Sequence, residues 1–74
     1  MLKKYLNAND LNCPLPLLKT KLSLSELNSG EILEITATDP TSWEDFASYA
    51  KISGNKLIHA KKKDGKFVYR IEKK

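Results

Sequence analysis

Cysteine is almost absent from this chain, with one residue, Cys13, in a sequence of 74. An internal disulfide needs two cysteines and a thiolate zinc site needs several, so the composition excludes both. The single histidine, His59, has no cysteine or second histidine near it in sequence and is expected as an ordinary strand residue. We therefore expect no metal, no bound cofactor and a reducing compartment.

Long apolar runs are missing as well. The first residues, Met1 to Tyr5, contain two lysines but lead into no extended apolar segment. This start matches neither a signal peptide nor a membrane span, and the chain length suits one small domain. We expect a single domain over residues 1–74, cytoplasmic and without a membrane partner.

Basic residues outnumber acidic ones by thirteen to nine, which gives a net charge of +4. Much of the excess falls late in the chain, at Lys61, Lys62, Lys63, Lys66, Arg70, Lys73 and Lys74. Such a patch can attract RNA or an acidic protein, or it can keep a hairpin soluble and discourage edge pairing. The second interpretation is favoured because the nearby aromatics, Phe67 and Tyr69, are expected to point into the core. Direct nucleic-acid binding is not expected.

Periodicity and turn residues predict the order βαβαββ. Strands are expected at residues 3–8, 31–38 and 56–62 and after the Asp64-Gly65 hairpin turn, with helices at residues 14–28 and from Thr41 to about Ser53. Leu33, Ile35 and Ala37 alternate with more polar residues, which is typical of a strand covered on one face only. The sequence therefore predicts an α+β fold, a two-layer sandwich with a mixed four-stranded sheet and two helices on one face.

The first helix carries two apolar stripes. One stripe should cover the sheet and consists of Leu17, Thr20, Leu24 and Leu27, with Gly30 expected to end the helix. The other consists of Leu15, Leu18 and Leu22, which form either the edge of the core or a docking surface. In the second helix a capping box from Thr41 to Glu44 is expected, with Ser42 and Asp45 as the alternative register, and Asp39 is expected as a turn and cap residue. Its core face is predicted from Trp43, Phe46, Ala47 and Ala50.

The run Asn12-Cys13-Pro14-Leu15-Pro16 places the only thiol at the start of the first helix. Proline is tolerated in the first turn, so Pro14 suits the first helical position and Cys13 the N-cap. The positive end of a helix dipole and free backbone N–H groups favour a thiolate over a thiol. This pattern indicates an exposed, reactive cysteine. The alternative is a buried structural cysteine.

The motif Cys-Pro-Leu-Pro resembles the Cys-Pro-x-Pro signature of the TusA/SirA-like sulfur-carrier family. Further matches follow in the family's order and spacing, at Gly30-Glu31, Asp39-Pro40, Asp45-Phe46 and Gly54 to Leu57. The resemblance implies a fold similar to the C-terminal domain of translation initiation factor three. It also implies that the cysteine takes up sulfane sulfur as a persulfide and relays it to an acceptor protein.

The resemblance implies a catalytic Cys13, with Pro14 and Pro16 as its scaffold and Asn12, Leu15 and Leu18 as binding residues. The donor would be a cysteine desulfurase or sulfurtransferase, and the sulfur would serve tRNA 2-thiolation, cofactor synthesis or sulfur metabolism. Such a protein acts with partner enzymes rather than alone.

Several positions differ from the family's usual pattern, among them Asn7, where aspartate is frequent, and Glu44, where a basic residue is common. Asp10 stands where the family usually has glycine, and aspartate tolerates a left-handed turn better than most residues. Asn12 stands where a basic residue is common.

Two hypotheses from other classes stay open. In one, the protein is a non-catalytic regulatory or interaction module, with the leucine stripe as its contact surface and an incidental thiol. In the other, less favoured, it is a small RNA-binding domain that uses the basic hairpin. No acid, base or oxyanion group accompanies Cys13 in sequence, so an independent enzyme is the least favoured reading.

Overall fold

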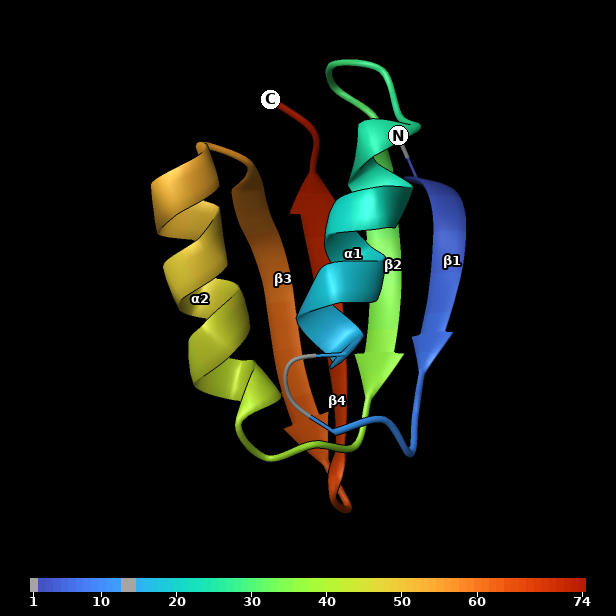
Figure 1. The fold of residues 1–74 in the computed structure, drawn as a ribbon, viewed down its shortest axis with the longest axis vertical. Helices are drawn as coiled ribbons and strands as arrows, with labels where there is room; N and C mark the ends of the chain where they lie inside the picture. The colour runs from blue at the N-terminus through green and yellow to red at the C-terminus, as the bar shows by residue number, and fades with distance from the viewer. Residues whose placement is uncertain (1, 13–14) are drawn as a thin grey trace.

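Two helices pack on one face of a four-stranded sheet in a computed structural model that describes residues 2–12 and 15–74 (Figure 1). The elements are β1 (Leu2–Ala8), α1 (Leu15–Ser25), β2 (Ile32–Ala37), α2 (Ser42–Ser53), β3 (Lys56–Lys63) and β4 (Lys66–Glu72). The strand order is β1-β2-β4-β3, with β1 parallel to β2 and the other pairs antiparallel. The predicted α+β fold, element order and mixed sheet are confirmed.

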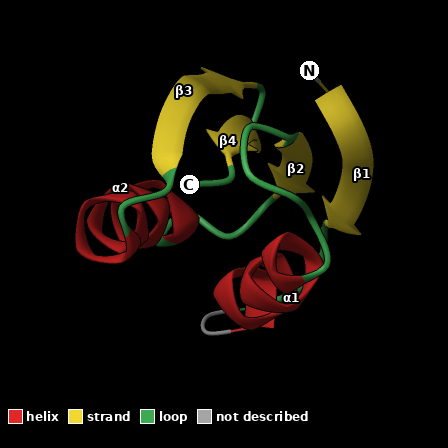
Figure 2. Ribbon diagram, turned by 90° about the horizontal axis from the view of Figure 1, so that it is seen from above, coloured by secondary structure: helices red, strands yellow, loops and turns green. Residues whose placement is uncertain are grey.

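The two layers are distinct when the molecule is seen from the end of the sheet (Figure 2). Both helices lie on the same side of the strands, and no helix covers the other side in the described part of the chain. No helix in that part is long and apolar enough to cross a membrane. The sheet therefore has one face in the core and one bare face.

The core is built on the alternation in the two central strands. Leu33, Ile35 and Ala37 of β2 are buried and pair in register with three buried residues of β4, Ile71, Tyr69 and Phe67. Burial of alternate residues places their neighbours on the bare face. The predicted inward faces of both strands are confirmed.

Helix α1 ends earlier than its leucine pattern predicts. Its last residue is Ser25, because the amides of Glu26 and Leu27 donate to the carbonyls three residues back, at 3.2 and 3.0 Å, and so tighten the chain. Leu27 is nevertheless buried, as expected. Gly30 has the positive φ of 88° that suits glycine, but it lies beyond the helix, where its N–H donates to the Lys73 carbonyl at 2.8 Å.

Helix α2 is rotated relative to the predicted core face. Its buried residues are Ser42 and Phe46, whereas Trp43 is 42% exposed and Ala47 is exposed. The cause is Tyr69: its hydroxyl is 2.7 Å from the Ser42 hydroxyl, and its ring stacks on Phe46 with centroids 4.4 Å apart. Trp43 lies at the flank, with its ring centroid 6.1 Å from that of Phe67.

The start of α2 is also organised differently from the predicted capping box. Thr41 has helical backbone angles and makes no side-chain capping bond within the described residues. Instead its N–H and its hydroxyl both donate to the Asp39 carboxylate, at 3.1 and 2.9 Å. Asp39 is thus the turn and cap residue that the sequence predicts. The predicted capping box is wrong.

Candidate functional site

The loop before α1 is fixed by a residue in the left-handed conformation. Asp10 has a φ of 64°, so aspartate adopts here the conformation for which the family usually has glycine, as predicted. Its backbone N–H donates to the Thr38 hydroxyl at 2.8 Å, and the Asn9 N–H donates to the Asn7 side-chain oxygen at 3.0 Å. These bonds join the loop to the ends of the parallel strands β1 and β2.

Thr38 is a positioning residue that the sequence analysis did not single out. It follows the last residue of β2, and Ala8 pairs with Ala37 at the end of the parallel ladder. A hydroxyl one residue past that pair therefore reaches the loop that leaves β1. Only the strand register shows this, because Thr38 and Asp10 are 28 residues apart.

The start of α1 contains the predicted site residues. Cys13 and Pro14 lie outside the residues that the structure describes, so the predicted helix-start thiol and its exposure stay predictions. On either side, the Leu15 N–H donates to the Asn12 carbonyl at 2.8 Å, which ties the loop to the first turn. Pro16 is buried, and its carbonyl accepts a bond from the buried Thr20 hydroxyl at 2.8 Å. Pro16 therefore lies where a scaffold residue is expected.

The second leucine stripe lies at the surface beside this helix start. Leu15, Leu18 and Leu22 are 45, 47 and 70% exposed, whereas Leu24 and Leu27 are buried. The two stripes of α1 thus separate into a core stripe and a solvent-facing one, as the spacing predicts. A row of exposed leucines on one helix face is typical of a contact surface.

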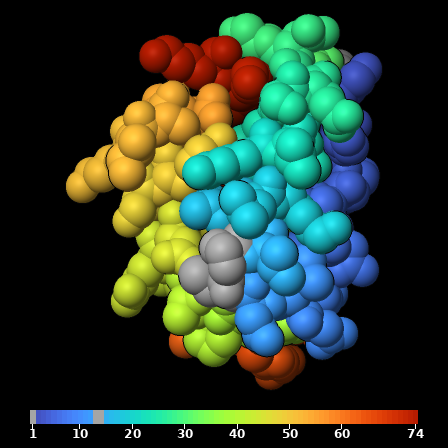
Figure 3. Space-filling model, viewed as in Figure 1, coloured from blue at the N-terminus to red at the C-terminus, as the bar shows by residue number. Residues whose placement is uncertain are grey.

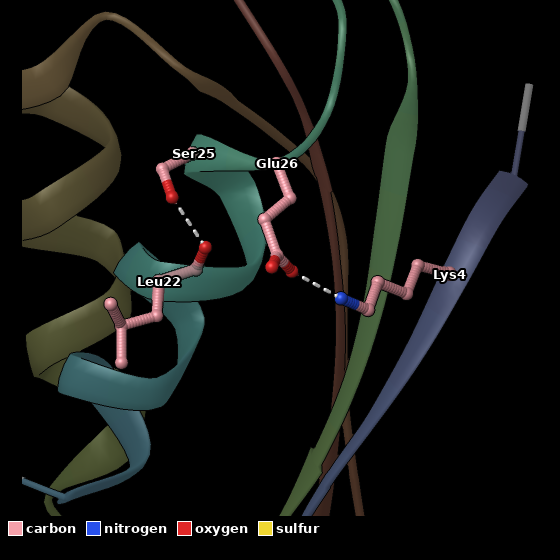
Figure 4. A network of polar contacts seen from close by, with 4 residues as sticks. All are labelled: Lys4, Leu22, Ser25 and Glu26. Atoms are coloured by element: carbon pink, nitrogen blue, oxygen red, sulfur yellow. Dashed lines mark hydrogen bonds and ion pairs between the residues drawn. The ribbon is translucent and has the colours of Figure 1, made fainter.

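The far end of α1 is held by polar contacts (Figure 4). Lys4 of β1 donates to Glu26 at 2.6 Å, and the Ser25 hydroxyl donates to the Leu22 carbonyl, also at 2.6 Å. Lys4 lowers the pKa of the Glu26 carboxyl below its usual value, by hydrogen bonding and by its charge. The Leu22 side chain points away from β1 and β2, so these contacts leave the exposed stripe open.

A second loop reaches the same end of the molecule. The turn that leads into α2 and the loop of residues 9–12 both appear at the lower end of the helix-covered face (Figure 3). A hollow of about 240 Å³ lies beside that turn, lined by Pro40, Trp43, Glu44, Lys62 and Phe67. Lys62 and Phe67 in this lining come from the hairpin of β3 and β4.

The ionisable groups of the described residues form no metal site. Within residues 2–12 and 15–74, no group of three His, Cys, Asp or Glu side chains could hold a metal ion. His59 is exposed on the edge strand β3, paired with Arg70, as expected of a strand residue. Burial raises the pKa of Tyr69, so its phenol stays neutral in the core, where its hydroxyl lies 2.7 Å from that of Ser42.

The chain has relatives among known proteins. The family model described as sulfurtransferase TusA matches residues 4–73. The chain belongs to the TusA family. The sulfur carrier protein TusA of Allochromatium vinosum is 47% identical over 92% of this chain and 90% of its own length. A putative sulfur carrier protein of Neisseria meningitidis is 32% identical over the whole of both chains.

The TusA-like fold is also found in a solved structure. The crystal structure of a SirA-like protein from Desulfitobacterium hafniense has a TM-score of 0.83, covering 95% of this chain and 96% of the other. At 22% identity this likeness shows the fold alone. The predicted membership of the TusA/SirA-like family is confirmed.

Proposed function

We propose that this protein is a sulfur carrier, in which Cys13 accepts sulfane sulfur as a persulfide and passes it to an acceptor protein. The observation that carries the proposal is family membership, because the TusA model covers residues 4–73 and so includes the Cys-Pro-Leu-Pro motif. A relative with 47% identity is named a sulfur carrier protein. The chain contains no other cysteine that could carry sulfur.

The chemistry needs one nucleophilic sulfur and two successive partners. The Cys13 thiolate attacks the outer sulfur of a donor persulfide, a new sulfur–sulfur bond forms on Cys13, and the donor cysteine leaves as a thiolate. An acceptor thiolate then attacks the outer sulfur on Cys13, and Cys13 leaves in turn. Each step exchanges one sulfur–sulfur bond for another, so no external oxidant or reductant is required.

The surrounding residues supply a rigid and partly apolar rim. Proline lacks a backbone N–H and fixes φ, so the sequence predicts that Pro14 and Pro16 limit the movement of the helix start. Leu15 and Leu18 are exposed and suit contact with the partner that covers the thiol, and Asn12 is exposed just before it. We assign these residues to partner binding rather than to bond making.

The partners follow from the same chemistry. A cysteine desulfurase or sulfurtransferase loads the carrier, and an acceptor protein unloads it toward tRNA 2-thiolation, cofactor synthesis or sulfur metabolism. The protein acts with these enzymes rather than alone, as one domain over residues 1–74. We place the relay in the cytoplasm, where a persulfide can form on a free thiol without competing disulfides.

The test is intact mass spectrometry after incubation with a cysteine desulfurase and cysteine, without reductant. A carrier gains about 32 Da for one sulfur, and the addition disappears on reduction. The matched control is Cys13→Ser, which should gain nothing. Alkylation of the folded wild-type protein measures separately whether the thiol is accessible.

Two outcomes would overturn the proposal. If the thiol is alkylated readily but takes no sulfur from a desulfurase or a thiosulfate sulfurtransferase, the interaction module becomes the better account. In that case Leu15→Asp and Leu18→Asp should abolish partner binding while Cys13→Ser preserves it. If the folded protein resists alkylation, the cysteine is structural.

A further inference from the structure

The bare face of the sheet presents an exposed aromatic residue. The register places Tyr5, Glu34, Arg70 and His59 side by side across the four strands on this face. Tyr5 is 70% exposed, because its neighbour Leu6 takes the inward position against the core. An exposed aromatic ring on an uncovered sheet is the element on which single-stranded nucleic acids stack their bases.

The basic excess of the chain falls in the β3–β4 hairpin, and most of its basic residues belong to this face. Residues 56–72, which form the β3–β4 hairpin, contain six Lys or Arg and two Asp or Glu, whereas the rest of the chain contains seven of each. The hairpin thus carries the whole net charge of +4. Lys61 pairs with Val68 and Lys63 pairs with Lys66, so these three lysines belong to the bare face near the hairpin turn.

Protection of a sheet edge does not account for these lysines. The other edge strand, β1, pairs its lysines, with Lys3 at 3.8 Å from Glu31 and Lys4 at 2.6 Å from Glu26. In the described part of the chain, Lys61, Lys63 and Lys66 form no ion pair. Lys66 moreover belongs to β4, an inner strand of the sheet. Their charge is therefore available to a ligand.

The three lysines also line a hollow. Its volume is about 370 Å³, with Val68 and Asp64 completing the lining. The carboxylate at the middle of the face, Glu34, is paired with Arg70 at 2.8 Å, so it repels an anion less than a free carboxylate would. Lys61 lies three strand spacings, roughly 14 Å, across the sheet from Tyr5 and two residues, roughly 7 Å, along it, a path that a few nucleotides can cover.

We propose that the bare face of the sheet binds single-stranded nucleic acid, with phosphates at Lys61, Lys63 and Lys66 and a base stacked on Tyr5. Phe67 and Tyr69 do point into the core, and Tyr5 supplies the aromatic ring that they cannot. A flexible phosphate chain suits this site better than an acidic protein does, because it can follow separate point charges across a flat face. The site lies opposite the helix layer, so it does not depend on sulfur transfer at Cys13.

The test is fluorescence anisotropy of a fluorescein-labelled oligouridine titrated with the full chain at several salt concentrations. Binding should weaken steeply as salt rises, because phosphate contacts release counterions. Changing Lys61, Lys63 and Lys66 together to Gln should lower the affinity at least about tenfold and flatten the salt slope by about two units, since each single-strand phosphate contact contributes about 0.7. The matched control changes Lys19, Lys21 and Lys51, on the two helices, to Gln and should weaken binding less than about twofold.

A second pair of variants tests the stacking contact separately. Tyr5→Leu should lower the affinity severalfold without changing the salt slope, and Tyr5→Phe should restore it, because stacking needs the ring and not the hydroxyl. The proposal is wrong if the helix control weakens binding as much as the hairpin variant, or if no RNA binds at low salt. It is also wrong if polyglutamate competes as well as RNA per charge, which would indicate an acidic protein ligand. Persulfide loading of the hairpin variant should stay unchanged, so failure here leaves the proposed sulfur carriage standing.

Discussion

The two helices cover the same face of one sheet, yet they use their surfaces differently. Helix α2 is anchored on Tyr69 through Ser42 and Phe46, and its exposed apolar residues, Trp43 and Ile52, lie at opposite ends. Helix α1 instead exposes Leu15, Leu18 and Leu22 in one stripe that begins at the Cys13 motif. The comparison indicates that α2 mainly stabilises the fold, while α1 also exposes an apolar face, which we propose as the contact surface for partners.

The largest expected effect is the loss of stability when the anchor of α2 on Tyr69 is removed. Phe46→Ala removes a fully buried ring that stacks on Tyr69, and we expect it to lower the free energy of unfolding by about 3–5 kcal/mol. That is most of the stability of a small domain. Urea denaturation followed by circular dichroism measures it, with Ile52→Ala, on the exposed side of the same helix, expected to change stability by less than about 0.5 kcal/mol. Equal losses of stability in the two variants would contradict the conclusion that Phe46 anchors α2.

The polar half of the anchor should contribute less. Ser42→Ala leaves the buried Tyr69 hydroxyl without its partner, and we expect a loss of about 1–3 kcal/mol. Combining it with Tyr69→Phe removes both hydroxyls, so the double variant should be more stable than Ser42→Ala alone. A double-mutant cycle measured by denaturation gives the coupling. Additive losses would show that the two hydroxyls act independently.

Substitutions in the exposed stripe of α1 should lower the rate of persulfide loading without changing the free energy of unfolding. Leu18→Asp is expected to leave the free energy of unfolding within about 0.5 kcal/mol and to lower the rate of persulfide loading by a desulfurase about tenfold. Ile52→Asp on α2 adds the same charge at an exposed apolar site and should load normally. Mass spectrometry at a limiting concentration of carrier measures the loading rates of the two variants and shows which helix contacts the desulfurase. Equal loading of both variants would remove α1 as the contact surface.

The smallest effect concerns the ion pair at the end of α1. Lys4→Met should return the pKa of Glu26 upward to its ordinary value, as followed by an NMR pH titration. Because the folded pKa is lowered, the pair stabilises the fold above the unfolded pKa of Glu26. This contribution is lost as pH falls through the folded pKa. If the pKa of Glu26 is the same in the variant, Lys4 does not form this ion pair in solution.

Local patterns predicted most of the fold because they are carried by nearby residues. The period of two in β2 and β4 fixed which residues face inward, and the two leucine stripes of α1 were visible in its spacing. The face of α2 was mispredicted because Trp43 is more hydrophobic than Ser42, while the reason for burying Ser42 is a tyrosine hydroxyl 27 residues away. A distant partner of this kind leaves no periodic signal.

The site was predictable to a similar extent. The turn tolerance of aspartate predicts the left-handed Asp10, which the structure confirms, whereas the thiol of the motif lies outside the described residues. The Thr38 bond that holds this loop depends on the register of two parallel strands, and the exposure of Tyr5 depends on which face the helices cover. The roles of Cys13 and Pro14 stay predictions.

The most direct test of sulfur carriage is an isotope chase on the intact protein. The chain is loaded by a cysteine desulfurase with cysteine that contains a heavy sulfur isotope, then supplied with ordinary cysteine and an excess of a small acceptor thiol. We predict that heavy sulfur appears on the peptide containing Cys13, then leaves and is replaced by the light isotope through repeated turnovers. A heavy label that stays fixed on Cys13, or one that never appears there, would contradict a carrier.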